Sequence, residues 1–275
     1  MPPPHKKHHT DWLVDTKTRL AIAGGREVEV WEFNHDGTDT ATMSAWAKHF
    51  RNHYCLDAEI DKLRKDTGLS RTEYLIKYKF PDIEEKPGPS IRAGDFGEIL
   101  IADFLEFMGG FWVPRTRYLD RVIRNESTKG SDVIGFKYVK EGSVSANDLL
   151  AIFETKTQFS GKKPSNRLQT AVNDSAKDQR RKGESLNAVK QVLFNKKRAA
   201  EANKVGRFQR EIDLPFKESY GAVALVEKSL YDAALVSATD CSKHKKAGQL
   251  RLIVVHGDQM MALVHALYER SSNEA

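Results

Sequence analysis

An acid and an amine stand two residues apart at the end of a strongly apolar stretch of this 275-residue chain. Residues 149–153 are all apolar, and Glu154, Thr155 and Lys156 follow them directly. Side chains alternate between the two faces of a β-strand, so Glu154 and Lys156 project to the same side. Burying a carboxylate and an ammonium at one sheet edge costs free energy. Such a pair therefore points to a functional site that uses both charges. The alternative is a strand that emerges into solvent, with Glu154 and Lys156 as its first hydrated residues.

A second carboxylate begins another apolar segment. Asp132 lies two residues after Gly130, and residues 133–136 are typical of a buried strand. Gly130 permits an unusual backbone conformation or a close approach of another group. If the two strands are neighbours, joined through the turn residues 141–143, Asp132 can come near Glu154. Asp132 could instead be a turn residue without a chemical role.

A third carboxylate, Glu98, lies on a helix that the spacing of apolar residues predicts over residues 90–108. Ser90 is the expected N-cap. The small residues Gly94 and Gly97 could let this helix approach a sheet or a phosphate closely. The alternative is that Glu98 is an exposed acid of the helix surface. Two other acids of the helix are weaker candidates: Asp95 and Asp103.

These residue types suit the metal-dependent hydrolysis of phosphodiesters, which are anionic and need charge neutralisation and an activated water. Mg²⁺, or Mn²⁺ in its place, binds carboxylate oxygens and lowers the pKa of bound water. We expect Asp132 and Glu154 to hold the ion, with Glu98 as a further ligand. We expect Lys156 to orient the water or to stabilise developing negative charge.

The remaining pattern predicts a mixed α/β core with a central sheet between helices. Strands are expected at residues 20–23, 26–33, 111–118, 132–139, 149–157, 220–226 and 250–255. Helices are expected at residues 40–53, 57–66, 71–77, 90–108, 165–181, 185–203 and 258–268.

The segment 81–89, rich in proline and charge, is the clearest linker-like break. We therefore expect a disordered tail at residues 1–10, an N-terminal α+β region at 11–89 that docks a partner, and a catalytic core at 90–275. The tail carries three histidines: His5, His8 and His9. They could hold a metal, although a disordered tail is the simpler interpretation.

The positive charge of the chain is regional. The formal net charge is +6, yet residues 161–217 carry fifteen Lys or Arg against six Asp or Glu, so the remainder is net negative. Such a basic helical segment favours DNA, held through phosphates without reading sequence. A solvated surface or a partner-binding face is the alternative. The candidate DNA contacts are Lys162, Lys163, Arg167, Lys177, Arg180, Arg181 and Lys182.

Other classes of protein are disfavoured by the composition. The two cysteines, Cys55 and Cys241, make neither a disulfide framework nor a zinc-binding pattern. No apolar segment approaches the roughly 20 residues that span a bilayer. The N-terminus lacks the apolar core of a signal peptide. We expect a cytoplasmic protein without membrane association.

The candidate residues resemble the PD-(D/E)XK nuclease superfamily, in which an acidic residue on a helix, a strand bearing Asp and a strand ending in Glu-x-Lys form the site. The matching positions are Glu98, Asp132, Glu154 and Lys156, although Ser131 replaces the proline of the motif. The resemblance covers roughly residues 90–179. It implies a restriction-endonuclease-like fold, Mg²⁺-dependent cleavage and an assisting polar residue on the next helix, for which Gln169 and Gln179 are candidates.

More narrowly, the chain resembles the HamA family, the nuclease components of Hachiman-type bacterial antiphage systems. The Gly-Asp-Phe-Gly-Glu, Lys-Gly-Ser-Asp and Phe-Glu-Thr-Lys segments and the chain length carry this resemblance. It implies a superfamily 2 helicase partner, HamB, and degradation of DNA. The alternatives are a free-standing restriction-type nuclease, an RNA-cleaving nuclease, and an adaptor that binds nucleic acid or a helicase without cutting.

Overall fold

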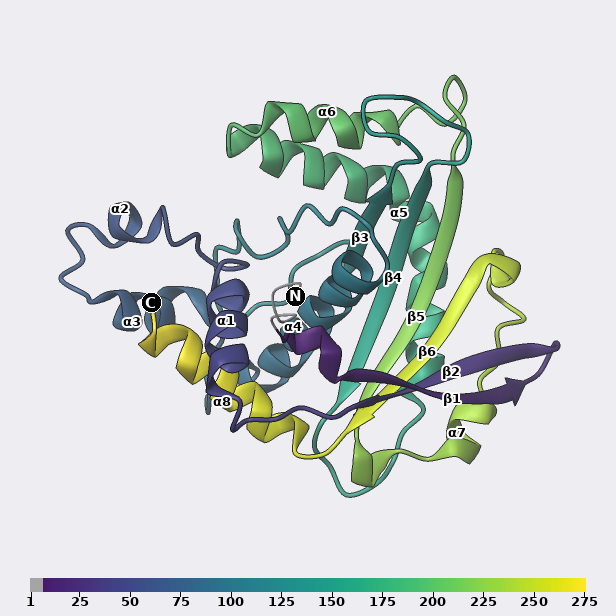
Figure 1. The fold of residues 1–275 in the computed structure, drawn as a ribbon, viewed down its shortest axis with the longest axis horizontal. Coiled ribbons are helices and arrows are strands. Elements are labelled where there is room, and N and C mark those ends of the chain that lie inside the picture. Colours follow the sequence, from purple (N-terminus) through teal and green to yellow (C-terminus); the bar gives the residue numbers. More distant parts are fainter. Residues whose placement is uncertain (1–6) are drawn as a thin grey trace, which may run out of the picture.

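A six-stranded sheet forms the centre of the computed structural model, which describes residues 7–275 (Figure 1). The strands are β1 (Leu13–Ile22), β2 (Arg26–Phe33), β3 (Val133–Lys137), β4 (Leu149–Gln158), β5 (Lys217–Glu227) and β6 (Leu250–Gly257). Their order is β1-β2-β6-β5-β4-β3. Strands β2, β6, β5 and β4 are parallel to one another, while β1 and β3 are antiparallel edge strands. The predicted α/β fold with a mixed sheet is confirmed.

Helices cover both faces of this sheet. They are α1 (Thr40–Arg51), α2 (Ile60–Arg64), α3 (Arg71–Tyr74), α4 (Gly88–Asp103), α5 (Arg167–Asn195), α6 (Ala199–Arg207), α7 (Ala233–Ser237) and α8 (Met260–Asn273). Leu75–Lys79 and Phe104–Met108 extend α3 and α4 as π-helical turns. Short 3₁₀ turns occupy His9–Trp12, Lys228–Leu230 and Ala247–Gln249. Within residues 7–275, none of the helices combines the length and apolarity that crossing a bilayer requires.

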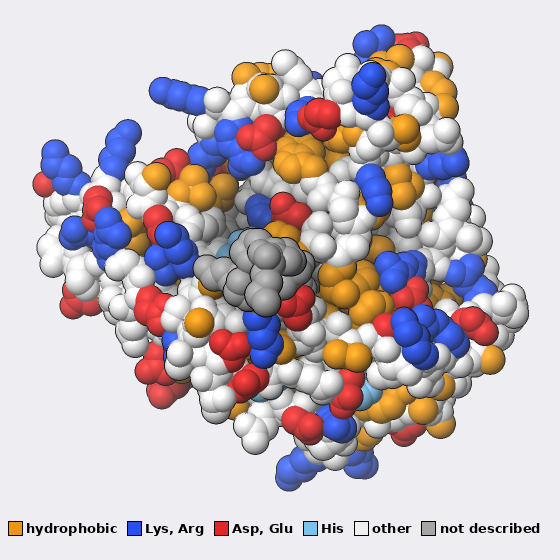
Figure 2. Space-filling model, viewed as in Figure 1, with side chains coloured by type: hydrophobic (Ala, Val, Ile, Leu, Met, Phe, Trp, Pro, Cys, Tyr) orange, Lys and Arg blue, Asp and Glu red, His pale blue; other side chains and the backbone are white. Residues whose placement is uncertain are grey.

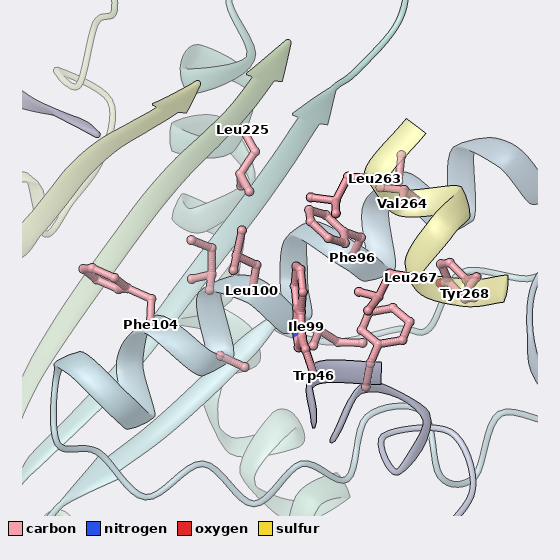
Figure 3. Close-up of a cluster of buried hydrophobic side chains, with 14 of the residues drawn as sticks. Trp46, Phe96, Ile99, Leu100, Phe104, Leu225, Leu263, Val264, Leu267 and Tyr268 are labelled. Carbon is pink, nitrogen blue, oxygen red and sulfur yellow. The ribbon is translucent and has the colours of Figure 1, made fainter. Parts of the chain in front are cut away.

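The alternation of side chains along β4 divides the core into two layers. Phe153 packs in the layer that α4, α8 and α1 form on one face, whereas Leu150 and Ile152 pack under α5 and α6 on the other. Figure 3 shows the first layer, in which Phe96 of α4 lies near Leu263 of α8. Strand β4 is therefore buried between helices on both faces, which fits its unbroken apolar run.

The N-terminal strands belong to the same sheet as the predicted core. Strand β2 pairs with β6 in parallel, with Val30 opposite Val254, and β1 pairs with β2 as a hairpin. Trp46 of α1 lies in the same hydrophobic layer as α4 (Figure 3). Residues 11–89 thus share a sheet and a hydrophobic core with residues 90–275. A role of this region in partner docking stays a prediction.

The strand expected at residues 111–118 is absent, and this prediction is corrected. Within this segment only Trp112 makes a β-bridge, to Phe136. Pro114 has no N–H to donate to a ladder, and Arg115 has a φ of +53°, so the chain cannot continue as a strand. The backbone from Pro114 onward is irregular, and Arg117 within it contributes to the site described below.

Two predictions about helix ends are also corrected. The helix expected at 165–181 and the first part of the helix expected at 185–203 form the single helix α5, since buried Leu186 and Leu193 hold the turns after Gly183 against the core. Residues 199–203 belong to the separate helix α6. This packing outweighs the roughly 1 kcal/mol that glycine costs in a helix. Helix α4 begins at Gly88, so Ser90 lies inside its first turn, where its hydroxyl donates to the Pro87 carbonyl at 2.7 Å.

The expectation of a disordered tail is wrong for residues 8–10. His9 is buried, its Nε2 atom lies 2.7 Å from Asp103 Oδ2, and its ring stacks on Trp46. Asp103 and Trp46 therefore hold His9 in place. Neither the position of His9 near the terminus nor the composition of residues 1–10 indicated this burial. Residues 1–6, including His5, lie outside the described residues.

Candidate functional site

Asp132 lies beside the end of β4, as the sequence predicted. Strands β3 and β4 are antiparallel with Val133 opposite Phe153, so the residue before β3 reaches the residues after Phe153. The backbone N–H of Thr155 donates a 3.0 Å hydrogen bond to Asp132 Oδ2. Gly130 leads into β3 with a φ of +90°, a conformation that glycine adopts readily. The expected proximity of Asp132 to the Glu-x-Lys segment is confirmed.

Glu154 and Lys156 project from β4 toward α5, on the same face as Ile152. Lys156 Nζ donates to Glu154 Oε1 at 2.5 Å and lies 3.0 Å from Asp174 Oδ2 of α5. Glu154 is only 6% exposed, so it is not the first hydrated residue of a strand that enters solvent. The buried acid and its lysine therefore form an ion pair inside the molecule.

Glu98 belongs to α4, which covers the face of the sheet opposite to α5 (Figure 1). The helix approaches β4 closely at Gly97, where a Cβ atom would stand 2.5 Å from Thr157 Cγ2. Gly94 has open space instead, so only one of the two predicted glycines permits the approach. The close contact at Gly97 positions the neighbouring Glu98 beside the start of β3.

Arg117 joins Glu98 to Asp132. Its Nε atom donates to Glu98 Oε2 at 2.5 Å, and its Nη2 atom donates to Asp132 Oδ1 at 2.7 Å. Tyr118 adds a hydroxyl donor to Glu98. Arg117 was not among the predicted residues, because the segment around it was expected to be a strand. The four predicted residues Glu98, Asp132, Glu154 and Lys156 are thus linked by direct contacts and by this one arginine.

A fourth carboxylate, Asp178 of α5, was also missed. It is 3% exposed, and Ser131 Oγ donates to its Oδ1 atom at 3.1 Å. Its Oδ2 atom is buried without a hydrogen-bond partner. The spacing of Asp174 and Asp178, four residues apart on a helix, could have indicated that both face the sheet. The predicted helper residues lie elsewhere: Gln169 contacts Asp240 and Gln179 contacts His244.

Burial and mutual repulsion raise the pKa values of these acids. Burial raises the pKa of Glu154 to about 7, although Lys156 opposes the shift. Burial raises the pKa of Asp132 to about 6 against the effect of Arg117, and Glu154 adds to the rise. Burial likewise raises the pKa of Asp178 to about 6. Each acid is thus held in a site where its ionised form lacks sufficient compensation.

The donor types suit a hard divalent cation, although among the described residues no three of these carboxylates bring ligand oxygens within 4.8 Å of one another. Glu154 and Asp178 are buried, and Glu98 and Asp132 are largely buried, whereas Arg117 and Lys156 are the cations that contact this group. The surplus of negative charge and the unpartnered Oδ2 atom of Asp178 are what a divalent ion would compensate. Oxygen ligands of this kind favour Mg²⁺ or Mn²⁺ over softer metals.

A cavity of about 270 Å³ adjoins this cluster. Glu98, Arg117 and Asp132 line one side of it, and apolar residues such as Val113 and Val192 line another. The cavity therefore gives access to Glu98 and Asp132 from the side of Arg117, while Glu154, Lys156 and Asp178 do not line it.

The predicted basic contacts divide into free and paired side chains. Lys177 is 2.5 Å from Asp174, and Lys182 is bonded to Glu211 at 2.6 Å and to Glu218. Lys177 is exposed although it is paired, Lys162, Lys163, Arg180 and Arg181 are exposed as well, and Arg167 is half-buried at the start of α5. Figure 2 shows basic side chains scattered among acidic ones on the face it presents. Contact of these residues with DNA stays a prediction.

Comparisons with known proteins agree with the narrower of the two resemblances. No curated protein and no solved structure matches the chain. The family model HamA matches residues 7–271, which is nearly the whole chain and includes every predicted site residue. The match also spans residues 11–89, whose two strands complete the sheet. The chain therefore belongs to the HamA family.

Proposed function

We propose that this chain is a metal-dependent nuclease of the PD-(D/E)XK type that hydrolyses phosphodiester bonds in DNA. The observation that supports the proposal is the group of buried and largely buried carboxylates at the Glu154–Lys156 pair. Asp132 bonds to the backbone beside Glu154, and Lys156 bonds to Glu154 itself. A globular protein has no structural need for such a surplus of buried acids, and strongly shifted carboxyl pKa values are typical of functional sites.

The roles of the acids follow from their contacts. Asp132 and Glu154 would hold Mg²⁺ or Mn²⁺, and Glu98 would supply a further ligand directly or through water. A divalent ion bound there would lower the pKa of its water and neutralise charge on the phosphate. Asp178, held by Ser131, faces the same cluster and could serve as an additional ligand or proton acceptor.

Lys156 is the residue that we expect to act on the attacking water or on the developing negative charge. Glu154 and Asp174 hold its ammonium from two sides. Burial lowers its pKa, but Glu154 outweighs burial and the net pKa lies above the ordinary value. Lys156 therefore carries a positive charge throughout the physiological range, which suits electrostatic stabilisation and orientation of water rather than proton abstraction.

HamA family membership is consistent with a role in antiphage defence. We propose that the chain acts there with a superfamily 2 helicase of the HamB kind and on DNA. The exposed basic residues between β4 and the middle of α5 would contact phosphates. Residues 11–89 would contribute to the docking of the helicase. Pulldown of the helicase with and without charge reversal at exposed positions of this region tests the docking.

The nuclease proposal is tested with purified chain, alone and together with a helicase of the HamB kind. Substrates are single- and double-stranded DNA and RNA, with Mg²⁺, Mn²⁺ or a chelator. We expect metal-dependent cleavage of DNA, lost by at least about 100-fold in Glu154→Gln and in Lys156→Met. Both variants keep the size of the side chain.

Glu184→Gln is the matched control, because Glu184 is an exposed acid on α5. It should cut like the unaltered chain. Cleavage of RNA alone would assign the chain to the RNA-cleaving alternative. DNA binding without cleavage under every condition, in company with the helicase, would support the adaptor and end the nuclease proposal.

A further inference from the structure

A buried histidine cluster at the end of α4 has no role in the proposed hydrolysis. His49 lies in the last turn of α1, His53 follows that helix, and Asp103 ends α4. One potential ligand atom from each of the three lies within 4.8 Å of the other two. Asp103 is fully buried and His53 is 4% exposed, while His49 is the more accessible member.

The two imidazole nitrogens of this cluster are spaced like two ligands of a single metal ion, and Asp103 lies within hydrogen-bond distance of one of them. His49 Nε2 lies 3.4 Å from His53 Nε2 and 2.8 Å from Asp103 Oδ1. Ligands around a tetrahedral zinc ion with bonds of 2.0–2.1 Å are about 3.3 Å apart. The two imidazoles therefore already stand at the separation of two ligands that share one ion. His53 lies in the turn directly after α1, and this turn brings its ring beside that of His49, with 5.1 Å between the ring centroids.

Arg115 places a cationic group at the point where these ligand atoms converge. Its Nη1 atom lies 2.7 Å from His53 Nε2 and 2.6 Å from Asp103 Oδ1. A guanidinium can only donate, so His53 Nε2 must present its lone pair, as a metal ligand does. Arg115 also donates to Glu106 from its Nε atom at 2.6 Å, which gives the side chain a second anchor outside the cluster.

The surroundings of Asp103 orient it as the carboxylate of a metal site is oriented. His9 Nε2 lies 2.7 Å from Asp103 Oδ2, so the other oxygen, Oδ1, faces His49 and Arg115. The ring of His9 stacks on Trp46 with 4.7 Å between centroids and an angle of 6°. A histidine that fixes a ligating carboxylate in this way is a common outer contact of metal sites.

We propose that His49, His53 and Asp103 form a binding site for one transition-metal ion, with zinc as the best fit, and that the ion displaces Arg115. Imidazole nitrogen selects zinc-like ions, whereas Mg²⁺ prefers oxygen. The site is therefore chemically distinct from the carboxylate cluster of the proposed nuclease. An ion held there would fasten α1 to the end of α4, the helix that carries Glu98.

The test is titration of the folded full-length chain with Co²⁺ and Zn²⁺, in an Asp132→Ala background that weakens the carboxylate site. We expect one Co²⁺ per chain with visible absorption bands of nitrogen and oxygen ligation, displacement of Co²⁺ by Zn²⁺, and a higher Tm with Zn²⁺. His53→Ala and Asp103→Asn should each lower the Co²⁺ affinity at least about tenfold. Circular dichroism establishes that each variant is folded.

Arg115→Met separates a metal site from a hydrogen-bonded cluster that is merely structural. If Arg115 competes with the ion, this variant binds Co²⁺ more tightly than the parent, whereas a structural cluster gains no affinity. His265→Ala on α8 removes a histidine outside the cluster and should leave the Co²⁺ affinity unchanged. Absence of stoichiometric binding by folded Arg115→Met, or an unchanged affinity in folded His53→Ala, overturns the proposal.

Discussion

Arg117 donates a 2.7 Å hydrogen bond to Asp132 Oδ1, and it holds the carboxylate of Glu98 with the same guanidinium. It therefore stands between two acids that we propose as metal ligands. In the absence of metal its charge stabilises both carboxylates. A divalent ion would bind the same carboxylate oxygens of Glu98 and Asp132. Arg117 and the ion would therefore neutralise the same negative charges.

We predict that Arg117→Ala lowers the stability of the metal-free chain and enlarges the stabilisation by Mg²⁺. Removing one partner from a buried ion pair costs about 3–5 kcal/mol, since it leaves the other charge unpaired. Mg²⁺ should recover part of that loss, because it neutralises Glu98 and Asp132. The measurement is the Tm of both chains with and without Mg²⁺ at about 10 mM, on the order of the concentrations that saturate weak carboxylate sites.

Arg121→Ala is the matched control for this prediction. Arg121 forms a more deeply buried pair with Asp95, at 2.5 and 2.7 Å. Arg121→Ala should lower the stability of the chain in the same way, but Mg²⁺ should shift the Tm of this variant by as much as that of the unaltered chain. Equal Mg²⁺ shifts in Arg117→Ala and Arg121→Ala would show that Arg117 does not share its ligands with the metal.

A second prediction concerns the pH dependence of the metal-free chain. Burial raises the pKa of Glu154 from 4.5 to about 7. The folded chain therefore binds this proton more tightly than the unfolded chain, so the contribution of Glu154 to stability increases as pH falls from about 8 toward 4.5. Relative to Glu154→Gln, the unaltered chain should gain on the order of 1–3 kcal/mol over this range.

Denaturant unfolding of both chains between pH 8 and pH 5, with chelator present, measures this difference. The comparison is needed because His9 and His53 have lowered pKa values, chiefly through burial, and act in the opposite direction below pH 6.5. Their effect is common to both chains and cancels. A free-energy difference that does not vary with pH would mean that Glu154 is ionised in the metal-free fold at neutral pH.

A third prediction uses the two glycines of α4. Gly97→Ala places a Cβ atom against Thr157 Cγ2, and Thr155 Cγ2 would also lie only 3.3 Å from it, so it should destabilise the fold by about 1–3 kcal/mol. Gly94→Ala meets no atom within 4 Å and removes a flexible residue from a helix, so it should stabilise by about 0.5–1 kcal/mol. Thermal or urea unfolding of the two variants measures both signs.

The same pair of variants reports on the position of Glu98. If α4 moves away from β4 to accommodate the new methyl group, the adjacent acid moves with it, and nuclease activity of Gly97→Ala should fall below that of Gly94→Ala. Equal stability and equal activity in the two variants would show that the approach of α4 to the sheet does not depend on glycine.

The structural features that the sequence predicted correctly are those that depend on the residue pattern within one segment. The apolar run before Glu154 defined β4, and the turn before it made an antiparallel partner for Asp132 predictable. Arg117 was missed because its segment follows Pro114 and a residue with positive φ, and irregular backbone has no period to recognise. The burial of His9 was missed for another reason, since it depends on Trp46 and Asp103, which are distant in sequence.

The last prediction concerns the basic residues of α5. Arg180 and Arg181 are exposed, whereas Lys182 is held by Glu211 and Glu218. Reversing both arginines to Glu should therefore weaken DNA binding and reduce the dependence of affinity on salt, by about one unit of log–log slope for each phosphate that the protein no longer neutralises. Lys182→Met should lower stability instead and leave that slope unchanged, because its charge is already neutralised. Fluorescence anisotropy of labelled DNA across a range of salt concentrations measures both slopes. An unchanged slope in the double arginine variant would assign this surface to solvent or to the helicase.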